Sequence, residues 1–241
     1  MQDGVTLSTL SIDTSDGNAK LDVITHNNGD MSLAVSTNTT LMSGIDDAYV
    51  LGAGALNLTG HSGDNTPEGN GAKNKLKGAS GDDLLKGYGG NDKLIGGKGN
   101  DKLVGASGDD TLKGSSGADL LKGGSGNDKL VGGSGDDRLK GGSGDDVLKG
   151  GSGDDTLWGG RGSDRFIFSA GNDVIRDFKD DADSIVVSRA MIDGAGSTVD
   201  DLLSMGEIVN GNAVFDLAGS HQLTVRGVDD LEDLRNDLII G

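Results

Sequence analysis

An apolar residue returns at every ninth position through the middle of the chain, from Leu85 to Phe166, and mostly polar residues flank it on both sides. Glycines dominate the interval between successive apolar residues, and an aspartate stands two positions before each one. The motif is Gly-Gly-x-Gly-x-Asp-x-Leu-x, and it occurs ten times in phase between residues 78 and 167. We number its positions one to nine. Self-similarity at such a short fixed period predicts a solenoid of stacked repeats rather than an ordinary globular domain.

The last three positions of each repeat have the pattern of a short strand. Side chains alternate in an extended chain, so the apolar residue at position eight faces one side and positions seven and nine face the other. Residues at the outer positions, such as Lys102 and Lys140, are largely polar. Two repeats then make one coil, strand–turn–strand–turn. The predicted fold is all-β: a right-handed parallel β-roll, a nonapeptide-repeat solenoid with two inner rows of leucine.

The first six positions of each repeat form a turn rich in oxygen ligands. Glycine at positions one, two and four allows positive φ and lets the carbonyl groups turn toward a common point, to which the aspartate at position six adds a carboxylate. Oxygen ligands without histidine or cysteine suit Ca²⁺ rather than zinc or copper, and Mg²⁺ demands a tighter octahedron. We expect each ion to lie between equivalent turns of neighbouring coils, for example between Asp119 and Asp137.

The candidate metal ligands are the position-six aspartates of eleven turns. They are Asp83, Asp92, Asp101, Asp110, Asp119, Asp128, Asp137, Asp146, Asp155, Asp164 and Asp173. Eleven turns leave nine intervals between equivalent turns, and we expect about seven to nine calcium ions to be bound. The formal net charge is −18, from 39 acidic and 21 basic residues. Because so acidic a chain repels itself, we expect folding and calcium binding to be one event.

Composition narrows the function further. With 45 glycines and 3% aromatic residues, the chain has little material for a conventional core. It has no cysteine, and hence neither disulfides nor thiolate metal sites. Strong negative charge argues against nucleic acid and anionic membrane surfaces as partners. No apolar run is long enough to insert directly into a membrane, and no conventional cleavable leader is evident. Common hydrolase motifs such as G-x-S-x-G and H-E-x-x-H are absent, so we expect no enzymatic activity.

The flanking sequences predict four regions. Residues 1–55 are read as a short β-rich N-terminal cap or the end of an upstream module, with a hairpin whose turn contains Asn28-Gly29. Residues 56–77 are degenerate entry coils, in which asparagine replaces the aspartate and Pro67 interrupts the leucine row. Residues 78–176 form the calcium-binding roll. Residues 177–241 are a β-rich or mixed C-terminal cap. It is expected to contain a short helix with a capping box just before Leu202, a hairpin at 207–217, and strands at 222–225 and 238–240.

The nonapeptide resembles the repeat of the RTX (repeats-in-toxin) family, whose parallel β-roll binds Ca²⁺ in its turns. The resemblance implies that backbone carbonyls early in the turns complete the ligand set, at Gly123, Ser125, Gly132, Ser134, Gly141 and Ser143. It also implies export by a type I secretion apparatus through an uncleaved C-terminal signal, and folding outside the cell. The expected location is therefore extracellular, free or attached to the cell surface. Where Ala79, Tyr88, Ala106 or Ser115 replaces the second glycine, we expect weaker binding.

Other roles for such a roll stay open. It could be the accessory module of a secreted protease, lipase or alginate epimerase whose catalytic, upstream effector domain lies outside this sequence. It could also be an adhesin or surface-layer segment. Regular ladders of serine at position three, among them Ser134 and Ser143, leave an ice-binding segment as a further alternative.

Overall fold

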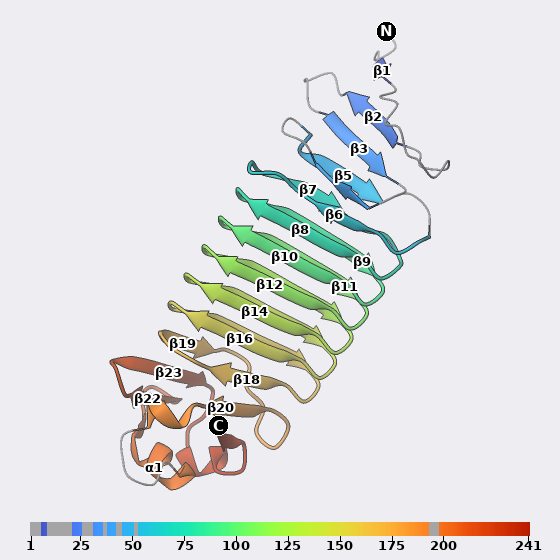
Figure 1. The fold of residues 1–241 in the computed structure, drawn as a ribbon. Helices are drawn as coiled ribbons and strands as arrows, with labels where there is room; N and C mark the ends of the chain where they lie inside the picture. Colours follow the sequence, from blue (N-terminus) through green and yellow to red (C-terminus); the bar gives the residue numbers. More distant parts are fainter. Residues whose placement is uncertain are drawn as a thin grey trace.

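The chain stacks into an elongated roll with two long sheets, closed at one end by a small C-terminal cap (Figure 1). The computed structural model describes residues 6–8, 21–25, 31–35, 38–41, 45–50, 53–192 and 198–241. Within these residues one sheet has ten strands and the other fourteen. Along the roll, successive strands alternate between the two sheets, so each coil contributes one strand to each.

The ten-stranded sheet is parallel throughout. In chain order, its strands are β4 (Thr39–Thr40), β6 (Asn57–Thr59), β8 (Lys75–Ser80), β10 (Lys93–Lys98), β12 (Thr111–Ser116), β14 (Lys129–Ser134), β16 (Val147–Ser152), β18 (Arg165–Phe168), β20 (Ser184–Val187) and β24 (Leu238–Ile240).

The fourteen-stranded sheet is parallel along the roll and antiparallel at both ends. In chain order, its strands are β1 (Thr6–Ser8), β2 (Leu21–Thr25), β3 (Met31–Val35), β5 (Asp47–Val50), β7 (Thr66–Glu68), β9 (Leu84–Gly89), β11 (Lys102–Ser107), β13 (Leu120–Ser125), β15 (Arg138–Ser143), β17 (Thr156–Arg161), β19 (Asn172–Ile175), β21 (Gly206–Ile208), β22 (Asn212–Leu217) and β23 (His221–Arg226).

The register confirms the coil of two nonapeptides. Leu103 on β11 lies opposite Leu85 and Leu121, each two repeats away. The leucines of position eight are buried almost completely, at 0–2% exposure, and form two inner rows that continue into Phe166 and Ile175. The predicted fold class, an all-β parallel β-roll, is therefore confirmed. Its core is only as thick as two facing rows of leucine.

The strands are longer than the sequence pattern predicts. A typical strand such as β13 has six residues, positions seven to nine and then one to three of the following repeat, where three were expected. Pairing between neighbouring coils continues through positions two and three, as in Gly124 opposite Gly142 and Ser125 opposite Ser143. The tight turn is thus confined to positions four to six.

Glycine is needed at positions one and two for different structural reasons. Position two adopts positive φ, 126° at Gly124, and so does position four. Position one does not, which corrects the expectation from the sequence. There a side chain is excluded because a Cβ on Gly123 would overlap the carboxylate of Asp128. The four non-glycine residues at position two, Ala79, Tyr88, Ala106 and Ser115, keep positive φ values of 74–103°.

The N-terminal part of the roll carries on the same stacking. β2 and β3 form the predicted antiparallel hairpin, and its turn at residues 26–30 lies outside the described residues. β3, β5 and β7 then pair in parallel, with no change of pattern near residue 55, so the boundary proposed there remains a prediction. Pro67 lies opposite Ala48, whereas the β7–β9 ladder is reduced to Glu68 opposite Lys86, the expected weakening.

The C-terminal cap continues both sheets of the roll. β20 and β24 extend the ten-stranded sheet from β18, and β23 pairs with β19. The short helix α1 (Val199–Ser204) begins with a capping box between Thr198 and Asp201, and its Leu202 is buried. The β21–β22 hairpin is also as predicted. Two 3-10 helices, η1 (Arg189–Met191) and η2 (Leu231–Leu234), complete the cap.

We predict that Ala106→Gly stabilises the folded protein by about 1 kcal/mol, because a non-glycine residue at positive φ carries a cost of that order. Chemical denaturation at saturating calcium measures the change. The matched control is Gly124→Ala, directly opposite Ala106 in the next coil, where the added Cβ would meet the Ala106 carbonyl and must destabilise. An Ala106→Gly protein no more stable than the parent would contradict the assignment of strain to this position.

Candidate metal centre

Eleven aspartate side chains are buried along the two edges of the roll. All the position-six aspartates predicted as ligands are 1–3% exposed. In each, Oδ1 accepts the backbone N–H of the equivalent residue one coil earlier; Asp119 N–H donates to Asp137 Oδ1 at 2.8 Å, for example. The side chains therefore bridge neighbouring coils. The structure brings together the pair Asp119 and Asp137, as expected from the sequence.

The other carboxylate oxygen has no protein partner. Oδ2 is buried and accepts no hydrogen bond in Asp83, Asp92, Asp101, Asp110, Asp119, Asp128, Asp137, Asp146, Asp155, Asp164 and Asp173. Nearly all buried polar atoms in proteins are hydrogen-bonded, and a carboxylate oxygen left without a partner is strongly unfavourable. Eleven such atoms in a regular array therefore indicate that a cation completes these sites.

Backbone carbonyls border the same spaces. A Cβ placed on Gly114 would meet Asp119 Oδ2 on one side and the Gly132 carbonyl of the next coil on the other, the latter at 2.7 Å. Gly132 is a position-one residue, and residues at position one are not paired with a residue of the neighbouring coil in the central strands. The same holds around Gly123, whose missing side chain leaves room between Asp128 and the Gly141 carbonyl. Among the predicted carbonyl ligands, those at position one thus face the aspartate row.

The predicted carbonyl ligands at position three are already engaged. The carbonyls of Ser125, Ser134 and Ser143 accept N–H groups from the preceding coil at 2.8–2.9 Å. A carbonyl oxygen has two lone pairs, so each retains one for a further partner. Their role as ligands remains a prediction. Carboxylate and carbonyl oxygens, with no nitrogen or sulfur among them, fit the hard oxygen coordination of Ca²⁺.

Burial also changes the acidity of these groups. It raises the pKa of Asp146 to about 6, that of Asp137 to about 7 and that of Asp173 to about 8, from an ordinary 3.8. Backbone N–H donors oppose the shift, and neighbouring aspartates add to it. Without a cation, the sites thus favour protonated carboxyl groups.

Comparison with known proteins agrees with this geometry. The family model described as the RTX calcium-binding nonapeptide repeat, in four copies, matches residues 68–103, 104–139 and 140–175. Residues 68–175 are therefore repeats of the RTX family. Its repeat region is accordingly a calcium-binding structural module. No curated protein matches the chain.

Among solved structures, the extracellular lipase LipA from Serratia marcescens aligns over 79% of this chain at 18% identity and a TM-score of 0.31. The alignment covers 40% of the lipase, so the chain spans less than half the length of that protein. No helix among the described residues has the length and apolar character needed to cross a membrane.

The two rows of position-six aspartates, here called the RTX rows, are each preceded by an asparagine whose side chain is hydrogen-bonded within the protein. Asn65 Oδ1 accepts the N–H of His61, and its amide NH₂ donates to the Gly63 carbonyl at 2.6 Å. Asn74 Oδ1 likewise accepts the N–H of Asn70. An amide donor here replaces the cation that an aspartate would require. The degenerate entry coils thus have amide hydrogen bonds at the positions where the aspartate sites would hold a cation.

The row containing Asp164 ends at Asp183, which takes the place of the next position-six aspartate but has both carboxylate oxygens hydrogen-bonded. Asp183 Oδ1 accepts the N–H of Asp164, as the next repeat would, but its Oδ2 accepts the N–H of Lys179. The Lys179 ammonium group donates to the Gly160 carbonyl. Neither residue was identified from the sequence, because an inserted residue puts Asp183 19 positions after Asp164 and out of phase.

A second ladder runs along the outside of the turns at position five. Asp82 Oδ1 accepts the N–H of Asn100, and Asp109 Oδ1 accepts that of Asn127, both from the following coil. The position-six bonds run the opposite way, so each pair of coils is held from both directions. The sequence analysis missed this role, although aspartate or asparagine at position five in most repeats was a usable signal. Ala118 provides no such acceptor.

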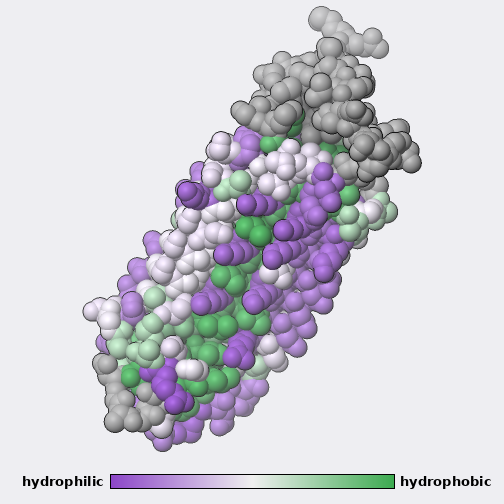
Figure 2. Space-filling view, in the orientation of Figure 1, coloured by the Kyte–Doolittle hydropathy of each residue, from purple (hydrophilic) through white to green (hydrophobic). Residues whose placement is uncertain are grey.

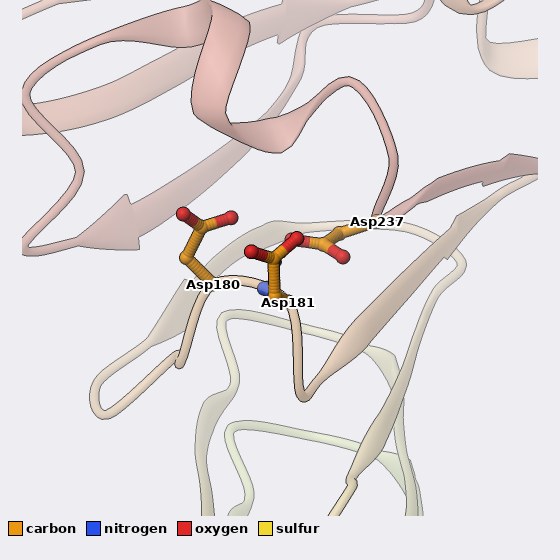
Figure 3. Close-up of side chains that lie close together, drawn as sticks. All are labelled: Asp180, Asp181 and Asp237. Carbon is orange, nitrogen blue, oxygen red and sulfur yellow. Dashed lines mark hydrogen bonds between the residues drawn. The ribbon is translucent and has the colours of Figure 1, made fainter.

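A separate acidic group lies in the C-terminal cap. Asp180 and Asp181 are neighbours in the loop before β20, and Asp237 reaches them from the segment before β24 (Figure 3). Their carboxylate oxygens lie within 4.8 Å of one another. Asp180 and Asp181 are exposed, and Asp237 Oδ2 already accepts the N–H of Asp181 at 3.2 Å. Unlike the RTX rows, this group has no orphaned oxygen, and we assign it no metal.

We predict that acid partly replaces calcium in folding. Because the carboxyl groups have a higher pKa in the folded roll than in the unfolded chain, the folded state binds more protons. The free energy of unfolding of the calcium-free protein must therefore fall as pH rises from near 3.8 through the folded values of about 6 to 8.

Circular dichroism in the presence of a chelator measures this effect. Lowering the pH from about 8 to about 5 should increase the β-signal of the calcium-free protein, whereas at fixed calcium the same change should weaken calcium affinity because protons compete. A β-signal that decreases steadily on acidification would contradict the proposed state of these carboxyl groups.

Proposed function

We propose that this chain is a calcium-dependent β-roll that folds on binding several Ca²⁺ outside the cell, and that it supports type I secretion and folding of itself or of an attached effector. The observation that carries the proposal is the two rows of buried aspartates whose Oδ2 atoms have no protein partner. A folded roll with these oxygens ionised and uncompensated would be unstable, so the cation belongs to the folded state.

The two rows set the scale of binding. Six aspartates, from Asp83 to Asp173, form one row, and five, from Asp92 to Asp164, form the other. These rows contain five and four intervals between coils. We propose about seven to nine bound ions, the upper figure being one ion in every interval. Nine dications would carry a charge equal and opposite to the formal −18 of the chain.

Calcium has a structural role in this proposal and no catalytic one. The core contains two rows of leucine and few aromatic residues, so hydrophobic burial alone holds each coil weakly. Each ion contacts oxygens of neighbouring coils and neutralises carboxylates that repel one another. A chain that cannot fold in a low-calcium cytoplasm stays extended for passage through a secretion channel and becomes rigid outside. We propose that residues 177–241 contain the export signal and that any catalytic effector lies outside this sequence.

Substitution of the central aspartates tests the proposed ligands. We expect Asp128→Ala, Asp137→Ala and Asp146→Ala together to lower the calcium stoichiometry by roughly three to five ions, since these residues border five intervals of the two rows. Isothermal titration calorimetry gives the stoichiometry, with Mg²⁺ as a comparison, and Trp158 fluorescence follows folding in the same titration.

The matched control removes three exposed carboxylates outside the roll, at Asp216, Asp229 and Asp233. It changes the net charge equally and should leave the stoichiometry unchanged. A full complement of calcium in the Asp128/Asp137/Asp146 variant would refute the assigned ligands. A chelated parent protein with the complete β-spectrum would refute coupled folding.

Truncation tests the role of the C-terminal cap. Deleting residues 177–241 removes β20 and β23, which cover the last strands of the roll, and exposes Phe166 and Ile175. We expect loss of calcium-triggered folding and of export from a cell that contains a type I apparatus. Deleting residues 1–55 provides the comparison and should preserve folding. Normal folding without the cap, combined with lost export, would reduce its role to that of an address.

A further inference from the structure

A pocket lined by lysines opens where the ten-stranded sheet begins. It has a volume of about 400 Å³ and lies beside β6, β8 and β10. Lys73 lines it from the turn before β8, Lys75 from the first residue of β8, and Lys93 from the first residue of β10. Asparagines and Ala55 complete the lining, which contains no acidic residue. The three lysines take no part in the aspartate rows that carry the calcium proposal.

Two of these lysines lie directly opposite each other. Lys75 on β8 pairs with Lys93 on β10 in the parallel register. Neighbouring strands are about 4.8 Å apart, and like charges directly opposite each other on one face of a sheet are destabilising. From β10 to β18, by contrast, a threonine or a valine separates each cation at position seven from the next. Figure 2 shows hydrophilic side chains spaced along a hydrophobic stripe on the roll.

The paired strands of the described residues contain one other opposed pair of cations, and that pair is engaged. Lys122 on β13 lies opposite Lys140 on β15, in the fourteen-stranded sheet. The Lys140 ammonium group lies over the face of the Trp158 ring, 4.7 Å from its centre. An aromatic face attracts a cation and partly offsets the repulsion within this pair. No aromatic residue lines the pocket at Lys75 and Lys93.

The pocket also lacks acidic partners. The ion pairs among the described residues include none of its three lysines, and all three are exposed. Between residues 64 and 172, Lys73 is the only cation at position five of a repeat, and Asn74 follows it at position six. On the other edge of the roll, the neighbouring repeats have Asp64 and Asp82 at position five. Positive charge therefore gathers without a counter-charge in a chain with 39 acidic residues.

Amide groups add hydrogen-bond donors to this pocket. Asn38 and Asn57 line it beside the lysines. Asn38 Oδ1 accepts the backbone N–H of Asn57 at 2.8 Å, which ties the Asn38 side chain to β6. Each asparagine side chain has two N–H donors in addition to its carbonyl oxygen. Ammonium and amide donors without an acidic acceptor form a set suited to an anion.

We propose that this pocket binds a small phosphate-bearing anion. A phosphate group has close to two negative charges at neutral pH and three acceptor oxygens, so it can contact three ammonium groups and offset the repulsion between Lys75 and Lys93. A single carboxylate has one charge and two oxygens and therefore compensates the pocket less well. The lysine stems and Ala55 provide apolar lining for the rest of the ligand. The enclosed volume limits that ligand to a small molecule.

The pocket requires the stacked roll, and in this respect the inference rests on the proposed function. Its walls come from four consecutive coils, because the register places Asn57 beside Lys75 and Lys75 beside Lys93, with Asn38 in the coil before them. An unfolded chain does not bring these side chains together. We expect phosphate to bind the calcium-loaded protein and not the chelated chain, and to raise the free energy of unfolding of the folded state that binds it.

The test uses inorganic phosphate and glycerol phosphate as probes, with the full-length protein at saturating calcium and probe concentrations below those that precipitate calcium phosphate. Phosphorus NMR titration measures binding. The variant Lys75→Gln/Lys93→Gln should bind the probes at least tenfold more weakly. The matched control, Lys122→Gln/Lys140→Gln, removes the other opposed pair with the same change of charge and should bind within twofold of the parent. Binding of inorganic phosphate alone identifies the free anion as the ligand, and binding of the ester identifies a phosphomonoester.

Stability provides a second measurement. Without phosphate, the variant Lys75→Gln/Lys93→Gln should be at least as stable as the parent in chemical denaturation with calcium, because it removes two opposed like charges. Added phosphate should stabilise the parent and leave this variant unchanged. Equal stabilisation of both proteins by phosphate would overturn the inference. If the double variant does not fold, Lys73→Gln takes its place, and undiminished phosphate binding by that variant overturns the inference.

Three further results would also overturn it. Equal losses of affinity in the two double variants would show attraction to overall charge. Succinate binding as tightly as phosphate would show a site without preference for the phosphate group. A parent protein that folds with calcium, as followed by circular dichroism, yet binds neither probe would refute the phosphate site and leave the proposed function intact.

Discussion

The structure depends on aspartate carboxylates that are buried although only one of their two oxygens is hydrogen-bonded to the protein. Each position-six aspartate gives one oxygen to a backbone N–H of the neighbouring coil and keeps the other without a protein partner. The first bond sets the distance and register between coils. Under the proposed function, the second oxygen makes that arrangement conditional on a cation, because an isolated buried charge is costly unless it is paired. Stacking and metal dependence therefore come from the same side chain.

The glycines follow from this constraint as much as from the turn. Position one is glycine because a Cβ would occupy the space that the carboxylate needs, although its φ is ordinary. At position two glycine is favoured because the backbone has a positive φ, yet four residues with side chains are tolerated there. The difference is physical: backbone strain at Ala106 has a modest cost, whereas a side chain at Gly123 would displace the Asp128 carboxylate.

The sequence predicts much of this fold because two signals share one nine-residue period. Leucine at position eight predicts the coil, and aspartate at position six identifies the turn. What it misses lies in contacts between coils. The position-five ladder depends on which N–H an Asp82 side chain reaches one coil away, and spacing within a single repeat does not reveal this. The ending at Asp183 is hidden because one inserted residue breaks the phase. Strand length was underestimated because glycine-rich residues pair when a neighbouring coil supplies the partner.

The ends of the rows explain why the array is finite. At the entry of the row from Asp92 to Asp164, the Asn74 amide donates to the Leu56 carbonyl, and at its exit the Lys179 ammonium donates to the Gly160 carbonyl. Both are donors built into the chain at places where a further repeat would need an ion. A row bounded in this way has a fixed number of cation-dependent intervals between two hydrogen-bonded ends.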